Sequence, residues 1–160
     1  MPTTATYSWI PSTARVVYVD GFGCVPRGTL QIAPPSLVWP AKDPSDTLDY
    51  VFYISFALAG NSGDTIATLD VAISPSNPGD LALNSSSADG DQAILWLSAG
   101  FAGTTYAVTV TVSTNSGRVI GRTVTLPVIQ LTAPPIASND ITDQTGAPIT
   151  DQNQQPITTS

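Results

Sequence analysis

The chain has 160 residues, a net charge of −7 and a charged fraction of only 11%. It has no His and one Cys, which excludes imidazole acid–base chemistry, an intrachain disulfide and a Cys-rich zinc site. Five cationic residues cannot form a patch that neutralises a phosphate backbone, and the net charge repels nucleic acid and anionic membrane surfaces. No apolar run has the roughly 18 residues that a membrane-spanning helix needs. We therefore expect no catalysis, no cofactor or metal, and no nucleic-acid or membrane partner.

The residue types favour strands over helices. All twelve acidic residues are Asp, Glu is absent, and Lys42 is the single Lys. Because Glu and Lys commonly fill exposed helix positions, their scarcity argues against helix anywhere in the chain. Thr, Val, Ile and Ser, punctuated by 14 Pro and 12 Gly, are typical of short strands joined by turns. The fold class predicted is all-β.

Residues 1–36 are predicted to form an N-terminal arm with short strands. Two β-like runs, 15–19 and 29–32, flank a Gly-rich stretch that contains Cys24, for which a small buried apolar role is expected. Trp9 lies in polar surroundings before Pro11, outside any predicted strand. It either anchors the arm to a partner or covers the chain's own sandwich. We expect partner contacts from Trp9, Ile10 and Arg15.

Residues 37–130 are predicted to form a globular core of about seven strands. Strong turn signals separate the runs 37–39, 48–58, 65–73, 81–83, 92–98, 104–113 and 119–130, with polar loops at 74–80 and 84–91. The clearest alternation places Tyr106, Val108, Val110 and Val112 on one face. This number and spacing of strands predicts an immunoglobulin-like sandwich.

Three details sharpen the expectation for the core. Tyr106 starts a strand after a Gly-rich corner, so its hydroxyl either returns to the preceding loop backbone, as in a tyrosine corner, or is simply half-buried. The shared parity of Tyr50, Phe52, Ile54 and Phe56 predicts a core face. Arg122 has the parity of inward-facing neighbours, and both burial with an Asp partner and release by a bulge near Gly121 remain open.

The carboxylates offer two groupings that deserve a chemical test. Asp43, Asp46 and Asp49 are spaced by three residues, and Asp89 and Asp91 flank a Gly. Calcium accepts such ligands, and glycosidases use paired carboxylates, but neither spacing fits a calcium-binding EF-hand loop. Solvated turn residues explain these Asp side chains, so the predicted metal and catalytic sites are none, although calcium at the Asp-rich loops stays open.

Residues 131–160 form an extended tail with an eight-residue near-repeat that starts at Ile141, Ile149 and Ile157. Each complete repeat ends in a Pro, Pro148 or Pro156, within a polar background. Such a segment is either a disordered tail or an assembly arm whose spaced Ile and Pro residues hold a neighbouring protein, for example by adding a strand to a sheet edge. The predicted partner-binding residues of the tail are Ile141, Pro148, Ile149, Pro156 and Ile157.

Several core segments together resemble a known family. They are Asp43-Pro44-Ser45-Asp46-Thr47-Leu48-Asp49-Tyr50, Gly63-Asp64-Thr65-Ile66, Ile94-Leu95-Trp96-Leu97-Ser98-Ala99-Gly100, Ala102-Gly103-Thr104-Thr105-Tyr106 and Thr114-Asn115-Ser116-Gly117-Arg118. This series resembles the phage and prophage fibre-tail adaptor proteins over roughly residues 38–128. The resemblance lies in strand and turn residues, and both terminal zones fall outside it.

The resemblance implies an immunoglobulin-like structural protein of a bacteriophage virion that joins the tail or portal vertex to tail fibres. It would lie in the tail or neck region of the virion after synthesis in the host cytoplasm. Its partners would be tail, portal or nozzle proteins, the tail fibre and further copies of itself. Two alternatives remain: a capsid decoration protein with the same fold, and a carbohydrate- or receptor-binding module with an exposed aromatic platform.

Overall fold

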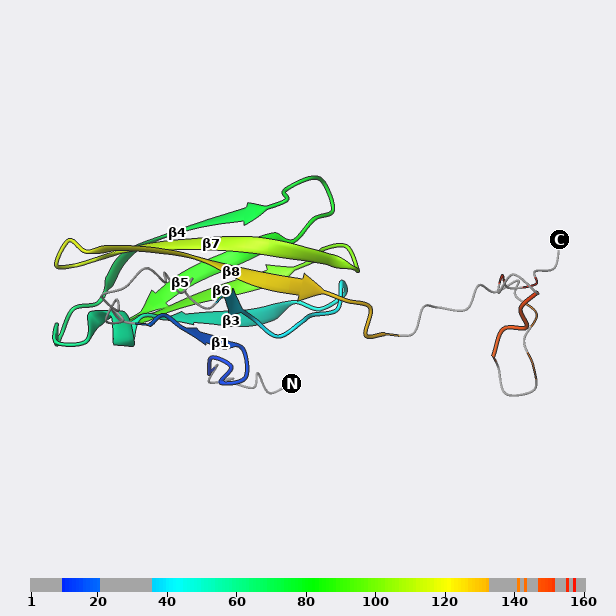
Figure 1. Cartoon of the computed structure of the whole chain (residues 1–160), viewed down its shortest axis with the longest axis horizontal. Helices are drawn as coiled ribbons and strands as arrows, with labels where there is room; N and C mark the ends of the chain where they lie inside the picture. The colour runs from blue at the N-terminus through cyan, green and yellow to red at the C-terminus, as the bar shows by residue number, and fades with distance from the viewer. Residues whose placement is uncertain are drawn as a thin grey trace, which may run out of the picture.

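The computed structural model describes residues 10–20 and 36–132 and, in the tail, residues 141, 143, 147–151, 155 and 157. Two mixed four-stranded sheets form an all-β sandwich (Figure 1). The first sheet has the order β1 (Val16–Tyr18), β3 (Leu48–Tyr53), β6 (Gln92–Ser98) and β5 (Ala82–Asp89). The second has the order β2 (Leu37–Val38), β8 (Val119–Val128), β7 (Thr104–Thr114) and β4 (Ile66–Ser74). Within the described ranges no helix is long and apolar enough to cross a membrane.

The core lies between the two sheets and follows the predicted alternation. On β7 the side chains of Tyr106, Val108, Val110 and Val112 are fully buried, which confirms the predicted inward face. Side chains of the first sheet, including Phe52 and Leu95, belong to the same cluster of buried residues. Trp39 is buried in this core and links the two sheets: its backbone N–H donates to the Thr125 carbonyl on β8, and its indole N–H donates to the Val51 carbonyl on β3 at 3.2 Å. Alternate side chains along β7 therefore face the space between the two sheets, as the period of two in a strand requires.

The described residues contain eight strands. Seven of them, β2 to β8, lie in residues 37–130, where about seven are predicted; the eighth, β1, lies in the predicted run 15–19 and pairs in parallel with β3. The Val51 N–H donates to the Arg15 carbonyl at 2.9 Å, and the Val19 N–H to the Tyr53 carbonyl at 2.8 Å. β1 thereby satisfies the backbone groups that β3 would otherwise expose at the edge of the sheet. The predicted strand at 29–32, like Cys24, lies outside the described residues.

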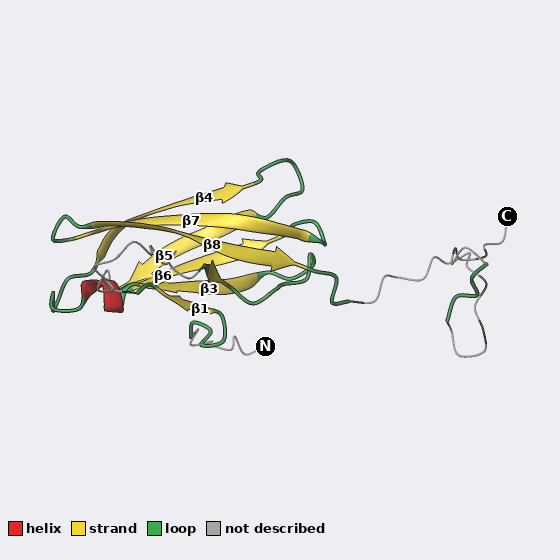
Figure 2. Cartoon of the chain, viewed as in Figure 1, coloured by secondary structure: helices red, strands yellow, loops and turns green. Residues whose placement is uncertain are grey.

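The predicted strand at 48–58 is too long. β3 ends at Tyr53, and a short 3-10 helix, η1 (Ser55–Leu58), follows it (Figure 2, red). The Ile54 N–H makes one more bond in the register of the β3–β6 ladder, to the Asp91 carbonyl at 3.0 Å, and the chain then turns. Tyr50, Phe52 and Ile54 are buried as predicted, but Phe56 is 55% exposed because the turn removes it from the strand face.

β5 continues through residues that the sequence predicts to be a loop. Its ladder with β6 runs to Asp89, with an irregularity between Leu83 and Ser85. Nearly all of its side chains are exposed, so the strand shows no apolar alternation. Pairing of backbone groups with β6, rather than burial of side chains, holds this stretch in the sheet.

Of the two arrangements that the sequence leaves open for Tyr106, the structure has the tyrosine corner. The Phe101 backbone N–H donates to the Tyr106 hydroxyl at 2.9 Å, so the hydroxyl does return to the preceding loop. The hydroxyl itself donates to the Asp80 carboxylate at 2.7 Å. One buried phenol therefore ties the loop before β7 to the loop before β5.

Arg122 is exposed, although its ladder with β7 continues without a bulge from Thr104 to Ser113. Its guanidinium donates to the neighbouring Gly121 carbonyl at 2.8 Å. Burial on β8 begins two residues later at Val124, where β2 pairs with the strand. The first part of β8 has no pairing with β2. Arg122 lies there, and its side chain is therefore open to solvent although its position in the strand alternation is that of the buried residues.

The sandwich has two distinct ends. The exit end is formed by residues 40–47, 75–81 and 99–103, and the C-terminal segment 129–132 leaves the sandwich there. The hairpin end is formed by residues 55–65, 89–92 and 115–118. In Figure 1 the β7–β8 hairpin lies at the left and the tail departs at the right.

Candidate partner-binding surfaces

The segment that precedes β1 is bound to the start of β3. The Asp49 carboxylate accepts hydrogen bonds from the Ser12 backbone N–H, at 2.6 Å, and from the Arg15 guanidinium. The Arg15 Nε also donates to the Asp49 carbonyl, at 2.6 Å. Burial raises the pKa of Asp49, but the bonds from Ser12 and Arg15 outweigh it and lower that pKa overall. Arg15 stays a predicted partner-binding residue, but its guanidinium already holds the N-terminal segment against the sandwich.

A second set of bonds holds the C-terminal exit. Lys42 is completely buried, and its Nζ donates to the carbonyls of Asp43 and Ala99, both at 2.7 Å. The Asp43 carboxylate accepts the backbone N–H groups of Leu131, at 2.7 Å, and of Thr132, at 2.9 Å. We call these residues, Lys42, Asp43, Leu131 and Thr132, the exit clamp. It fixes the point at which the tail leaves the sandwich.

The bonds of the exit clamp explain the ionisation of its residues. Hydrogen bonds from Ser45, followed by those from Thr132 and Leu131, lower the pKa of Asp43 well below its usual range. Burial lowers the pKa of Lys42, while the charges of Asp46 and Asp43 partly oppose this effect. The interpretation of the Asp-rich turn as simply solvated is therefore wrong for Asp43 and Asp49, whose side chains are buried because they bind terminal segments. Within the part of the chain that the structure covers, no group of three or more Asp, Glu, Cys or His side chains could hold a metal ion.

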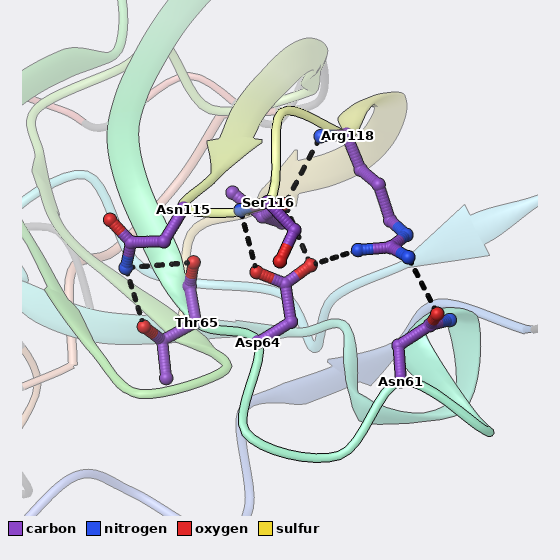
Figure 3. Close-up of polar contacts among 7 residues, drawn as sticks. Asn61, Asp64, Thr65, Asn115, Ser116 and Arg118 are labelled. Atoms are coloured by element: carbon purple, nitrogen blue, oxygen red, sulfur yellow. Dashed lines mark hydrogen bonds and ion pairs between the residues drawn. The ribbon is translucent and has the colours of Figure 1, made fainter.

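A polar network braces the hairpin end (Figure 3). Its centre is Asp64, which accepts hydrogen bonds from the Thr114 hydroxyl at 2.8 Å and the Ser116 N–H at 3.1 Å. The Arg118 guanidinium pairs with Asp64 at 2.7 Å and also donates to the Asn61 side chain at 2.6 Å. Although burial raises the pKa of Asp64, these bonds lower it to about 2. The network therefore fixes the β7–β8 hairpin relative to the turn at 59–65.

Three aromatic rings gather where β1, β3 and η1 meet. The Tyr18 ring lies 5.4 Å from the Tyr53 ring and 5.8 Å from the Phe56 ring, measured between centroids. The interplanar angles are 90° and 62°, so the rings meet edge to face and do not form a flat platform for a sugar. Tyr18 and Phe56 are about half exposed.

Among the described residues, two strand edges of the sandwich have no further strand beside them, on the side away from β1 and β2. β5 ends the order of the first sheet and β4 ends that of the second. β5 contains no Lys, Arg or Pro, which are common residues that discourage pairing at an edge. These edges can accept a further strand from another chain.

The repeat in the tail closes into a ring of backbone hydrogen bonds. The Ile149 N–H donates to the Ile141 carbonyl at 2.7 Å, the Ile157 N–H to the Ile149 carbonyl at 2.9 Å, and the Ile141 N–H to the Ile157 carbonyl at 2.8 Å. We call this arrangement the isoleucine ring. The structure therefore brings together three of the predicted tail residues, with Pro148 exposed next to Ile149.

The other predicted site residues are dispersed or fall outside the described part. Ile10 is 76% exposed in the N-terminal segment. Trp9 and Pro156 lie outside the described residues. Sequence reasoning missed Lys42, Asp43 and Asp49 as the residues that fix both terminal segments. The sequence offered one indication of this role: the single Lys of the chain, Lys42, stands next to Asp43 in a protein with few charged residues.

Comparison with known proteins shows the family to which the chain belongs. No curated protein matches the chain. The family described as podophage GP4 fiber-tail adaptor protein gp77 matches residues 42–127. The matched range begins at the exit clamp and runs almost to the end of β8, and it leaves out the N-terminal segment and the tail. Since the match covers more than half of the chain, this protein belongs to the family of podophage fibre-tail adaptor proteins, a structural family of the bacteriophage tail.

Proposed function

We propose that this chain is a non-enzymatic structural protein of a bacteriophage virion that connects the tail or portal vertex to the tail fibres. The family match supports the adaptor role. The structural observation that carries the proposal is that both terminal segments are fixed at the same end of the sandwich. Asp49 holds Ser12 there, and Asp43 holds Thr132.

This arrangement suits a protein with two different partners. Segments that leave from one end can contact one partner, while the braced hairpin end and the open edges remain available for another. We assign the arm contacts to Trp9 and Ile10 in the N-terminal segment and to the Ile and Pro residues of the tail. The unpaired edges of β4 and β5 suit contacts between further copies of the same protein at the vertex.

A cryo-EM reconstruction of the phage particle that contains this chain tests where the protein lies in the virion. Symmetry should be relaxed around the tail vertex. We expect density for the sandwich at that vertex, in contact with both a tail or portal protein and a fibre protein. Density spread over the capsid lattice would instead make the chain a decoration protein. An isolated domain that binds glycans and contacts no second virion protein would make it a receptor-binding module.

Truncation tests the role of the tail separately. A chain that ends at Thr132 keeps the last bond to Asp43 and therefore keeps the sandwich intact. We expect the truncated protein to melt like the full chain but to be lost from particles assembled in its presence. Normal incorporation of the truncated protein, together with normal fibre attachment, would remove the tail from the proposal.

A further inference from the structure

The tail differs from an extended arm, because its three repeats are closed on one another. Each Ile of the isoleucine ring both donates one backbone bond and accepts one, at 2.7–2.9 Å. While the ring is closed, these N–H and C=O groups are not available to add a strand to another sheet. The tail therefore presents side chains to a partner rather than a free backbone edge.

The repeats also form matching turns. The Asp143 N–H donates to the Ala147 carbonyl at 2.8 Å, and the Ala147 N–H donates back to the Asp143 carboxylate at 3.0 Å. Asp151 and Gln155 make the same two bonds at 2.8 Å and 3.0 Å. The two complete repeats thus form the same turn, and the three backbone bonds between the Ile residues give the ring its approximate threefold equivalence.

The three Ile side chains are equivalent in exposure as well. Ile141, Ile149 and Ile157 are 39%, 42% and 39% exposed. A partner that repeats the same pocket three times around an axis can fill three similar apolar sites on one ring at once with one kind of contact. A partner with a single pocket can use only one of them.

We infer that the isoleucine ring docks on the axis of a homotrimeric fibre protein, with one Ile unit received by each fibre chain. This inference rests on the proposed adaptor function and adds the symmetry and chemistry of the contact. Residues 131–160 carry three Asp and no Lys or Arg, so the complementary fibre surface has apolar pockets with a neutral or basic rim. Simultaneous use of three weak sites gives an affinity that none of them provides alone.

The test uses the full chain and the purified fibre protein of the same phage. Native mass spectrometry should find one copy of this chain for each fibre trimer. A fibre protein that is not a trimer, or a complex with three copies of this chain per trimer, would overturn the inference.

Side-chain variants measure the equivalence of the three units. Burying the exposed part of one Ile corresponds to about a threefold to eightfold change in Kd, so Ile141→Ser, Ile149→Ser and Ile157→Ser should each weaken binding by that factor. With additive free energies, the triple variant should weaken binding by about thirtyfold to five-hundredfold. Ile129→Ser is the matched control, because Ile129 is 41% exposed but lies outside the ring, and it should bind normally.

A backbone variant tests the ring itself. Ile149→Pro removes the N–H that donates to the Ile141 carbonyl, so it should weaken binding well beyond Ile149→Ser. Equal binding by these two variants, or an effect of only one Ile, would contradict a closed threefold contact. If the chain that ends at Thr132 binds the fibre as well as the full chain, the ring inference fails while the adaptor function stands. Absence of any binding between the full chain and the fibre would overturn both.

Discussion

Removal of the Tyr106 hydroxyl tests the part of the structure that joins the loops at the exit end. In Tyr106→Phe the ring remains in the core, but two hydrogen bonds are lost: one to the Asp80 carboxylate at 2.7 Å and one from the Phe101 N–H at 2.9 Å. A bond to a charged group contributes about 1.5–3 kcal/mol to stability and a neutral bond about 0.5–1.5 kcal/mol. We therefore expect a loss of about 2–4 kcal/mol in the free energy of unfolding.

The assay is thermal and urea denaturation of the purified chain, with Tyr18→Phe as the control. At about 4 °C per kcal/mol, the expected decrease in Tm is about 8–16 °C for Tyr106→Phe. Tyr18 is half exposed, so its substitution should change the free energy of unfolding by less than about 0.5 kcal/mol. Similar stabilities of the two variants would refute the assignment of Tyr106 as a structural link.

The pH dependence provides a second check on the same bond. The hydrogen bond from Tyr106, followed by that from the Asn77 N–H, lowers the pKa of Asp80 from its ordinary value. A carboxyl with a lowered folded-state pKa stabilises the fold above its unfolded pKa, and this contribution is lost as the pH falls through the folded value. The difference between wild type and Tyr106→Phe should therefore be full at pH 7 and shrink below about pH 4. A difference that stays constant down to pH 2 would contradict this reasoning.

Three further predictions concern the remaining contacts. Because hydrogen bonds lower the pKa of Asp64 to about 2, its stabilising contribution should be lost as the pH falls from about 4 towards 2, and Asp64→Asn should flatten this part of a Tm-against-pH curve. Arg15→Ala leaves the Asp49 carboxylate without its ion pair, so it should lower the free energy of unfolding by about 1–3 kcal/mol and speed amide exchange in β1. Arg122→Ala is the control and should lower the free energy of unfolding by less than about 0.5 kcal/mol. Gly100 has a φ of 99°, and an added Cβ would lie 3.0 Å from a Val128 methyl group, so Gly100→Ala should lower stability by about 1–3 kcal/mol in chemical denaturation.

The strands with strong side-chain patterns could be predicted from sequence. β7 alternates clearly, so its inward face follows from the period of two, and β6 is a short apolar run between two turns that contain Gly. β5 could not be found in this way, because an exposed edge strand rich in Ser is held by backbone pairing and has no apolar face. η1 could not be predicted for a different reason. Its apolar residues continue the apolar run of β3, so the sequence does not reveal that the backbone has already turned.

The candidate sites were only partly visible in the sequence. The repeat identified Ile141, Ile149 and Ile157 as a set, but closure of the ring depends on contacts between residues eight and sixteen positions apart. Asp43 and Asp49 looked like ordinary turn residues, because their role depends on N–H groups 88 and 37 positions away along the chain. Local spacing identifies residue types, whereas these long-range partners require the fold.

The exit clamp also determines how the protein responds to a pulling force on its tail. The tail continues from β8, which is an inner strand with β2 and Lys42 on one side and β7 on the other. Tension applied along β8 acts parallel to the strand, so the hydrogen bonds on both of its sides share the load and must slide together rather than open one at a time. A tail attached in this way resists a pull along its own direction more strongly than a pull that peels β8 from one neighbour.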